Sequence, residues 1–184
     1  EDYPNTLPDD IFIKIVAIIR LAAPYTGMII STRESQKVRE KVLELGVSQI
    51  SGGSRTSVGG YTTPERHDET AQFDVSDLRS LDQVVSWLFD MKHIPSFCTA
   101  CYRAGRTGDR FMALVKAGKI GHCCTPNALF TLKEYLIDYA EPDTRRKGEE
   151  MIAREVANIQ EPNIRRLTIQ YLKEIEAGQR DFRF

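Results

Sequence analysis

The chain has 184 residues, enough for one or two small domains. Its 41% apolar and 28% charged residues are usual for a soluble protein with a core. A net charge of -1 argues against a nucleic-acid-binding protein, which would concentrate positive charge. Without an apolar run of 18 residues or a signal peptide, we expect no membrane span and a cytoplasmic location. Because an initiator Met is lacking, we expect the chain to begin partway through a longer protein.

Residues 1–92 alternate helix and strand signals. Helices are predicted from Leu7 to Pro24, over 34–45 and from the capping box at Ser80, and buried strands are predicted over 28–31 and 47–51. In the first helix we expect the inward side chains to be those at one helical spacing: Ile11, Ile15, Ile18, Ile19 and Ala22. Trp87 is interpreted as a packing residue of the last helix.

This alternation predicts an α/β fold with parallel strands joined by crossover helices. Two strands alone make a poor sheet, because buried parallel strands need neighbours on both sides. The first half is therefore expected to be the end of a larger α/β domain, or a piece that another polypeptide completes.

From residue 93 onward the sequence is irregular and then helical. Thr107 is predicted to cap a short helix, and Thr125-Pro126 to begin a longer one that Pro142 closes. Two more helices are predicted to begin at Asp143-Thr144 and at Pro162. The inward residues of the longer helix are expected to be Leu129, Leu132, Leu136 and Tyr139.

Four cysteines cluster in this half of the chain. Cys98 and Cys101 form a C-x2-C pair that can hold one metal from one side, and Cys123 and Cys124 follow later. We prefer Cys124 as the third ligand, because the predicted helix start behind it would favour a thiolate. Cys123 would then point elsewhere and pack.

Three thiolates with an open fourth position are typical of an iron–sulfur cluster. The charge of such a cluster could be offset by three basic neighbours, Arg103, Arg106 and Arg110. A zinc site with His122 as the fourth ligand is an alternative, and a set of buried free thiols is another.

Polar residues follow both predicted strands of the first half. Arg33, after Ser31, would project at a strand end, where a guanidinium can bind a carboxylate, or it could pair with Glu34. The glycine-rich segment 51–61 could bind an anion or form a plain surface turn. His67 and His93 are interpreted as surface or supporting residues rather than ligands.

Residues 25–34 and 50–61 resemble the last two strands of the radical-SAM enzymes that cleave aromatic amino acids. Residues 98–103 and 124–129 resemble the cluster domain of the tyrosine lyases that mature FeFe-hydrogenase. The resemblance implies that residues 1–92 are the terminal βα units of a (β/α)8 radical-SAM barrel and that residues 93–184 are a mainly helical cluster-binding domain.

The same resemblance implies site residues and chemistry. Cys98, Cys101 and Cys124 would hold a 4Fe-4S cluster with an additional iron, where tyrosine-derived dehydroglycine becomes CO and cyanide for the hydrogenase H-cluster. Ser31 and Arg33 would bind the amino-acid head of tyrosine. The hydrogenase maturation machinery would be the partner of the complete enzyme.

The chain departs from the family in its first part. The C-x3-C-x2-C signature and the first six barrel strands are absent, so S-adenosylmethionine and a further 4Fe-4S cluster would bind only the missing N-terminal barrel portion. We therefore predict no catalytic residue in this chain and expect it to be inactive alone. The rival hypothesis is a non-enzymatic zinc- or cluster-stabilised helical interaction module.

Overall fold

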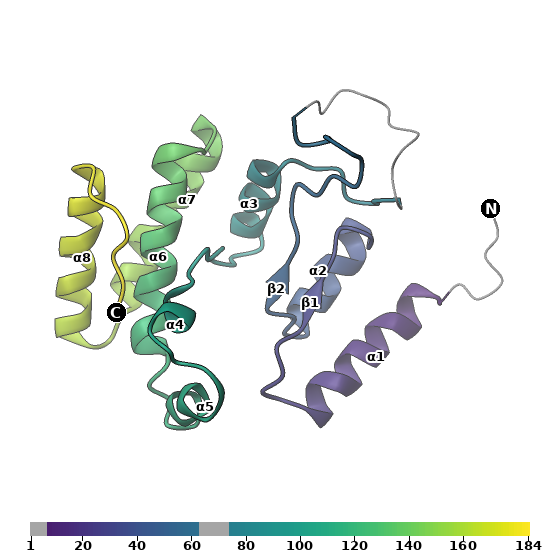
Figure 1. Cartoon of the computed structure of the whole chain (residues 1–184), viewed down its shortest axis with the longest axis horizontal. Coiled ribbons are helices and arrows are strands. Elements are labelled where there is room, and N and C mark those ends of the chain that lie inside the picture. The colour runs from purple at the N-terminus through teal and green to yellow at the C-terminus, as the bar shows by residue number, and fades with distance from the viewer. Residues whose placement is uncertain (1–6, 63–73) are drawn as a thin grey trace. The chain divides into compact units, whose positions relative to one another are not determined.

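The computed structural model describes residues 7–62 and 74–184, which form two compact units, Glu1–Leu81 and Asp82–Phe184 (Figure 1). Val85 and Phe89 belong to the core of the second unit, so the units divide before residue 92. A domain boundary at residue 92 stays a prediction. Within the described residues, no helix is long and apolar enough to cross a membrane.

The first unit contains the predicted alternation of helices and parallel strands. Its elements, in chain order, are α1 (Asp9–Ala22), β1 (Ile29–Ile30), α2 (Gln36–Glu44) and β2 (Gln49–Ile50). The two strands pair in parallel, with Ile29 opposite Gln49 and Ile30 opposite Ile50. Two short strands are all that the described residues contribute to a sheet, so the (β/α)8 barrel stays a prediction.

Local signals explain where α2 begins and ends. The Ser35 hydroxyl accepts a hydrogen bond from the Val38 N–H, which caps the first turn. Gly46, with φ of 92°, takes the left-handed conformation that ends the helix, and the Val47 N–H returns to the Val42 carbonyl. Val38 and Val42 of the helix, and Val47 just after it, thereby enter the small core of this unit.

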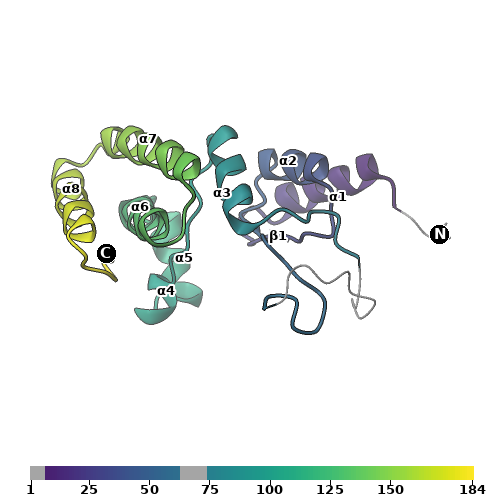
Figure 2. The ribbon, with the colours of Figure 1, turned by 90° about the horizontal axis from the view of Figure 1, so that it is seen from above.

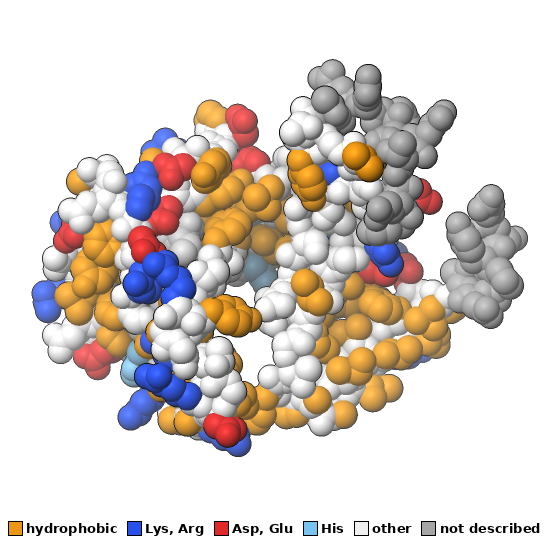
Figure 3. Space-filling model, viewed as in Figure 1, with side chains coloured by type: hydrophobic (Ala, Val, Ile, Leu, Met, Phe, Trp, Pro, Cys, Tyr) orange, Lys and Arg blue, Asp and Glu red, His pale blue; other side chains and the backbone are white. Residues whose placement is uncertain are grey.

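The predicted inward face of α1 is wrong. Ile15 and Ile18 are 41% and 63% exposed, while Val16 is buried and Phe12 and Ile13 pack beside it. Hydrophobic side chains lie exposed along α1 in Figure 3. Both faces of this helix are apolar, so periodicity alone could not identify the face that the unit buries.

The second unit is helical, as predicted. It contains α3 (Leu81–Asp90), α4 (Ala100–Arg103), α5 (Gly108–Lys116), α6 (Gly121–Asp138), α7 (Pro142–Asn158) and α8 (Pro162–Glu176). The view along α6 shows α7 and α8 flanking it (Figure 2). Leu129, Phe130, Leu132 and Leu136 of α6 are fully buried in this core. Trp87 of α3 is also buried, consistent with its expected packing role.

Two contacts set how closely these helices approach. A Cβ added to Gly148 of α7 would lie 2.6 Å from the methyl groups of Leu136, so only glycine fits there. Asp82 at the start of α3 accepts hydrogen bonds from the Tyr135 and Thr144 hydroxyls and from the Glu141 N–H. One carboxylate thus ties α3 to the corner between α6 and α7.

Two predicted helix boundaries and one predicted inward residue differ from those observed. α6 begins at Gly121 rather than at Thr125, with Pro126 inside the helix. Pro142 begins α7 rather than closing α6, which is a normal place for proline because the first helical N–H needs no partner. Tyr139 lies at the end of α6 and is 75% exposed, so it is not inward.

Candidate functional site

The C-x2-C pair lies on a short turn that is attached to α6. The Cys98 sulfur accepts a hydrogen bond from the Ala100 N–H at 3.4 Å, and Cys101 lies in α4. The Phe97 N–H donates to the Thr131 hydroxyl of α6 at 3.2 Å. An N–H directed at sulfur stabilises the thiolate form that binds metals.

Cys123 and Cys124 lie in the first turn of α6. Their N–H groups both donate to the Ile120 carbonyl, at 3.1 and 2.9 Å. Cys124 is therefore inside the helix rather than in front of its first residue, which corrects the position predicted from Thr125-Pro126. It still lies in the first turn of α6, at the positive end of the helix dipole.

The four cysteine thiols lie close enough to affect one another. Partial desolvation raises the pKa of the Cys124 thiol, and the charges of Cys101, Cys98 and Cys123 raise it further. Arg106 acts in the opposite direction, and its Nη1 lies 3.8 Å from the Cys123 sulfur. Because its pKa is raised, the Cys124 thiol loses its proton most readily when a metal cation binds to its sulfur.

The cysteines are neighbours but do not form a ready ligand cage. Across residues 7–62 and 74–184, no three His, Cys, Asp or Glu side chains are grouped so that they could hold a metal ion. The donor chemistry nevertheless fits a thiolate-bound cluster, because the sulfurs have an N–H donor at Cys98 and a guanidinium at Cys123.

Two of the predicted basic neighbours have specific partners. Arg106 contacts the Cys123 sulfur, and its role in offsetting the charge of a cluster stays a prediction. Arg103 instead forms an ion pair with both carboxylate oxygens of Asp181. The sequence reasoning did not anticipate Asp181, and nothing in the spacing could have indicated a partner so distant in the chain.

The histidines add little to the site. His122 is exposed and borders a cavity of about 350 Å³ between the start of α6 and the α7–α8 corner, where Thr125, Glu155 and Asn158 also lie. His93 is half-buried with its Nδ1 2.8 Å from the Met91 carbonyl, in keeping with a supporting role. His67 lies outside the described residues.

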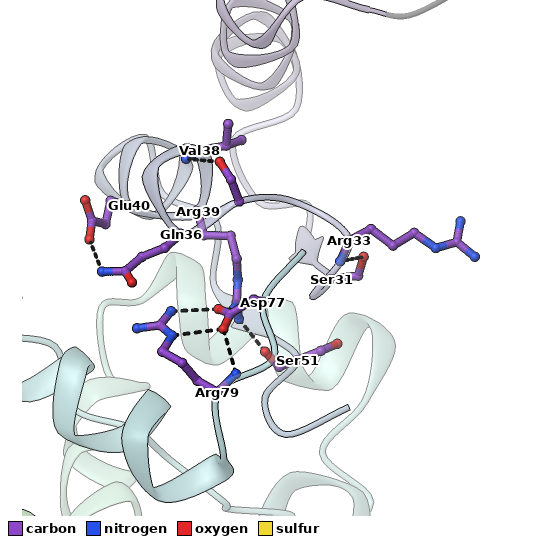
Figure 4. Close-up of polar contacts among 10 residues, drawn as sticks. Ser31, Arg33, Gln36, Val38, Arg39, Glu40, Ser51, Asp77 and Arg79 are labelled. Carbon is purple, nitrogen blue, oxygen red and sulfur yellow. Dashed lines mark hydrogen bonds and ion pairs between the residues drawn. The ribbon is translucent and has the colours of Figure 1, made fainter. Parts of the chain in front are cut away.

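The strand-end residues Ser31 and Arg33 are both exposed. The Ser31 hydroxyl accepts a hydrogen bond from the Arg33 N–H at 3.2 Å, and the Arg33 side chain extends away from the neighbouring polar network (Figure 4). The two residues therefore lie together at the end of β1, and a role in binding substrate stays a prediction.

A buried ion pair that sequence reasoning missed organises the same strand ends. Arg39 of α2 donates to Asp77 and to the Ser51 carbonyl after β2 (Figure 4). The Asp77 N–H donates to the Thr32 carbonyl after β1 at 3.0 Å. The available signal was a charged residue within the apolar stripe of α2, next to Val38.

The glycine-rich loop folds as a compact turn through its described part. Gly59 has φ of 73°, and the Gly60 N–H donates to the Ser57 carbonyl at 3.1 Å. The Arg55 N–H donates to the Tyr61 hydroxyl at 3.2 Å. Since these N–H groups are already used within the loop, the geometry favours the surface turn over the anion site.

The pattern of a known domain matches this chain. Residues 1–93 match the Biotin and Thiamin Synthesis associated domain, which is half of the chain, and the chain belongs to this family. Over almost its whole length it also corresponds to the C-terminal region of HydG, described as a maturase of the [FeFe]-hydrogenase. It is 48% identical to that solved structure, with a TM-score of 0.91, covering 99% of this chain and 39% of the other.

Other relatives agree with this placement. HydG from Carboxydothermus hydrogenoformans is 38% identical, with a TM-score of 0.67, over 94% of this chain and 35% of that one. The 2-iminoacetate synthases of Salmonella typhimurium and Escherichia coli are 36% and 34% identical over 76 residues. That match spans 41% of this chain and only 20% of either synthase.

Proposed function

We propose that this chain carries the second iron–sulfur site of a HydG-type radical-SAM tyrosine lyase. Cys98, Cys101 and Cys124 hold a 4Fe-4S cluster in this proposal, and Cys123 is not a ligand. The supporting observation is that the Cys124 thiol, in the first turn of α6, lies near enough to Cys98, Cys101 and Cys123 to be affected by their charges, in a chain that is 48% identical to HydG. When bound, the cluster would supply an iron site with a coordination position left open for an additional iron.

The protein's own residues prepare this site in three ways. The Ala100 N–H donates a hydrogen bond to the Cys98 sulfur, and Cys124 lies in the first turn of α6, at the positive end of the helix dipole. The Arg106 guanidinium offsets further negative charge from its place beside Cys123. The first turn of α6 also fixes Cys124 on a rigid element, while the C-x2-C turn approaches from a separate segment.

Anaerobic reconstitution with iron and sulfide tests the ligand set. The wild-type chain is expected to hold about four irons and four sulfides and to show the broad visible absorption of a cluster. Cys98→Ser, Cys101→Ser and Cys124→Ser should each lose most of this iron. Cys123→Ser is the matched control and should keep it.

The same experiment distinguishes the proposed cluster site from the rival hypothesis of a non-enzymatic interaction module. If the protein is colourless and binds one zinc ion that is lost in His122→Ala, the result would favour a structural zinc site and a non-enzymatic interaction role over the cluster. Equal iron loss in Cys123→Ser and Cys124→Ser would contradict the assigned ligands.

In the complete enzyme, the first unit supplies the terminal βα units of a (β/α)8 barrel, and Ser31 and Arg33 bind the amino-acid head of tyrosine. The order of helices and parallel strands supports this role, as does the position of both residues at the end of β1. The Arg33 guanidinium would form a bidentate pair with the substrate carboxylate. The product of that enzyme would be CO and cyanide for the hydrogenase, and this chain alone would be inactive.

Tyrosine binding by the complete enzyme tests the role of Arg33. Arg33→Ala should weaken tyrosine binding by at least ten-fold, because a charge-assisted pair would be lost. Lys41→Ala, which removes an exposed cation from α2, should leave it unchanged. Unchanged affinity in Arg33→Ala would rule out the carboxylate role.

A further inference from the structure

The last residues of the chain return along α6 as a docked strap, which we call the return segment (residues 179–184). Gly178, with φ of 98°, ends α8, and the Gln179 N–H bonds back to the Glu174 carbonyl. The chain then runs beside α6 in both views of the ribbon (Figures 1 and 2).

Specific contacts fasten the return segment to the helical core. Buried Asn127 of α6 accepts a hydrogen bond from the Phe184 N–H at 2.8 Å and donates to the Phe184 carbonyl at 3.4 Å. The Phe182 ring stacks on Tyr171 at 4.6 Å, and the Phe184 ring stacks on Phe130 at 5.9 Å. The segment is thus held by both its backbone and its aromatic rings.

The return segment also holds the cysteine-bearing turn. Arg103, two residues after Cys101, pairs with both oxygens of Asp181, with Nη2 2.8 Å from Oδ2. Arg106 donates from Nη2 to the Phe184 carbonyl at 2.7 Å, while its Nη1 faces the Cys123 sulfur. Arg103 and Arg106, which both follow Cys101 in the chain, therefore both bond to the return segment.

The backbone of Asp181 adopts an unfavourable conformation in this arrangement. Its φ of 69° lies in the left-handed region, which is unfavourable for a residue with a side chain. The conformation is maintained because the Asp181 N–H bonds to Glu134 at 2.8 Å while the carboxylate faces Arg103.

Contacts on both sides hold the turn that carries Cys98 and Cys101. α4 has four residues, too few to be stable alone, and both cysteines are half-exposed. Before Cys98, Phe97 bonds to Thr131 and stacks on Tyr135, and Ala100 within the turn is buried. Beyond Cys101, Arg103 and Arg106 bond to the return segment.

We propose that the return segment is a clasp that sets the position of the Cys98/Cys101 pair relative to Cys124. Asp181 and Arg103 are its positioning residues, and Arg106 links it to the start of α6. The assignment rests on the proposed iron–sulfur site, since its purpose is to keep three thiolates in register for one cluster.

The test uses Asp181→Gly, Asp181→Asn and Arg103→Gln in the full chain. Asp181→Gly removes the carboxylate but suits the left-handed backbone, so it separates the loss of the clasp from misfolding. In reconstituted protein, each variant should lose iron to a chelator about three- to five-fold faster, a change of the size that an exposed ion pair supports. The electron paramagnetic resonance spectrum of the cluster should broaden or shift, while the unfolding midpoint of Asp181→Gly stays near wild type.

Two controls complete the experiment. Arg146→Gln breaks an exposed arginine pair elsewhere, on α7, and should change neither iron release nor the spectrum. The charge-exchanged variant R103D/D181R should restore slow release. The clasp is overturned if the Asp181 and Arg103 variants release iron at the wild-type rate with an unchanged spectrum.

Hydrogen exchange of the metal-free chain keeps this inference separate from the proposed function. Amides 99–106 should exchange faster in Asp181→Gly than in wild type, even if no cluster forms. If the chain takes up no iron but amides 99–106 exchange faster in Asp181→Gly, the cluster proposal is refuted and the clasp is supported. If the chain takes up iron but these amides exchange at the same rate in both proteins, the cluster proposal is supported and the clasp is refuted.

Discussion

Arg39 and Asp77 form a buried ion pair that joins α2 to the segment preceding α3, within the first unit of the chain (Figure 4). Their side chains are 0% and 2% exposed. Arg79 also grips Asp77, with Nη2 2.7 Å from Oδ2 and Nε 2.9 Å from Oδ1. Because Arg39 and Asp77 bond to carbonyls after β2 and β1 respectively, the pair defines the end of the sheet where Ser31 and Arg33 lie.

Removing one member of this pair should strongly destabilise the protein. We expect Asp77→Ala to lower the free energy of unfolding by about 3 kcal/mol, because it leaves the Arg39 charge buried without its carboxylate. Urea unfolding measures this loss. Lys41→Ala, which breaks the exposed pair with Glu44 on the same helix, should cost less than about 1 kcal/mol. Equal effects of the two substitutions would contradict a structural role for the buried pair.

The pair should also make stability depend on pH. The hydrogen bond from Arg79, together with the Arg39 charge, lowers the pKa of Asp77 below its ordinary value of 3.8. A carboxylate whose folded pKa is depressed stabilises the protein above the unfolded pKa and loses that contribution as pH falls through the folded pKa. The stability difference between wild type and Asp77→Asn should therefore be full at neutral pH and shrink below about pH 4. A difference that stays constant from pH 7 to pH 3 would show that Asp77 is not shifted.

Gly148 should not tolerate a side chain. The Cβ of Gly148→Ala would meet the Leu136 methyl groups at 2.6 Å, so we expect a loss of about 1–3 kcal/mol from overpacking of α6 against α7. Gly121→Ala is the control, because a Cβ there meets nothing within 4 Å. Thermal unfolding measures the loss of stability in each of the two variants. The double variant Leu136→Ala/Gly148→Ala should lose less stability than the sum of the two single changes, since the two sites touch.

The exposed face of α1 provides a test of the proposed partnership with an N-terminal barrel portion. Ile18→Lys and Leu21→Lys alter side chains that are 63% and 83% exposed, so the chain alone should keep its unfolding midpoint. If an N-terminal barrel portion of the proposed enzyme covers this face, both variants should bind that portion, produced separately, at least ten-fold more weakly. Lys14→Glu, on the charged side of the helix, is the control. Unchanged binding in all three variants would show that the partner does not use this face.

Much of the secondary structure followed from local signals. Pro162 begins α8, Gly46 follows the end of α2, and short β-branched runs contain β1 and β2, because proline, glycine and branched side chains restrict the backbone wherever they occur. The start of α6 could not be predicted in this way. The turn before Gly121 supplies the carbonyl that the Cys123 and Cys124 N–H groups need, so the helix extends in front of Pro126.

The sequence by itself determined the order of elements, the helical second half and the cysteines as the residues of interest, since each depends on neighbours in the chain. Only the tertiary structure decided which face of α1 is buried, that Arg39 meets Asp77, and that Asp181 reaches Arg103. Those outcomes depend on which distant surfaces pack together. The gain from removing apolar area from water, or from pairing charges, has no fixed spacing along the chain.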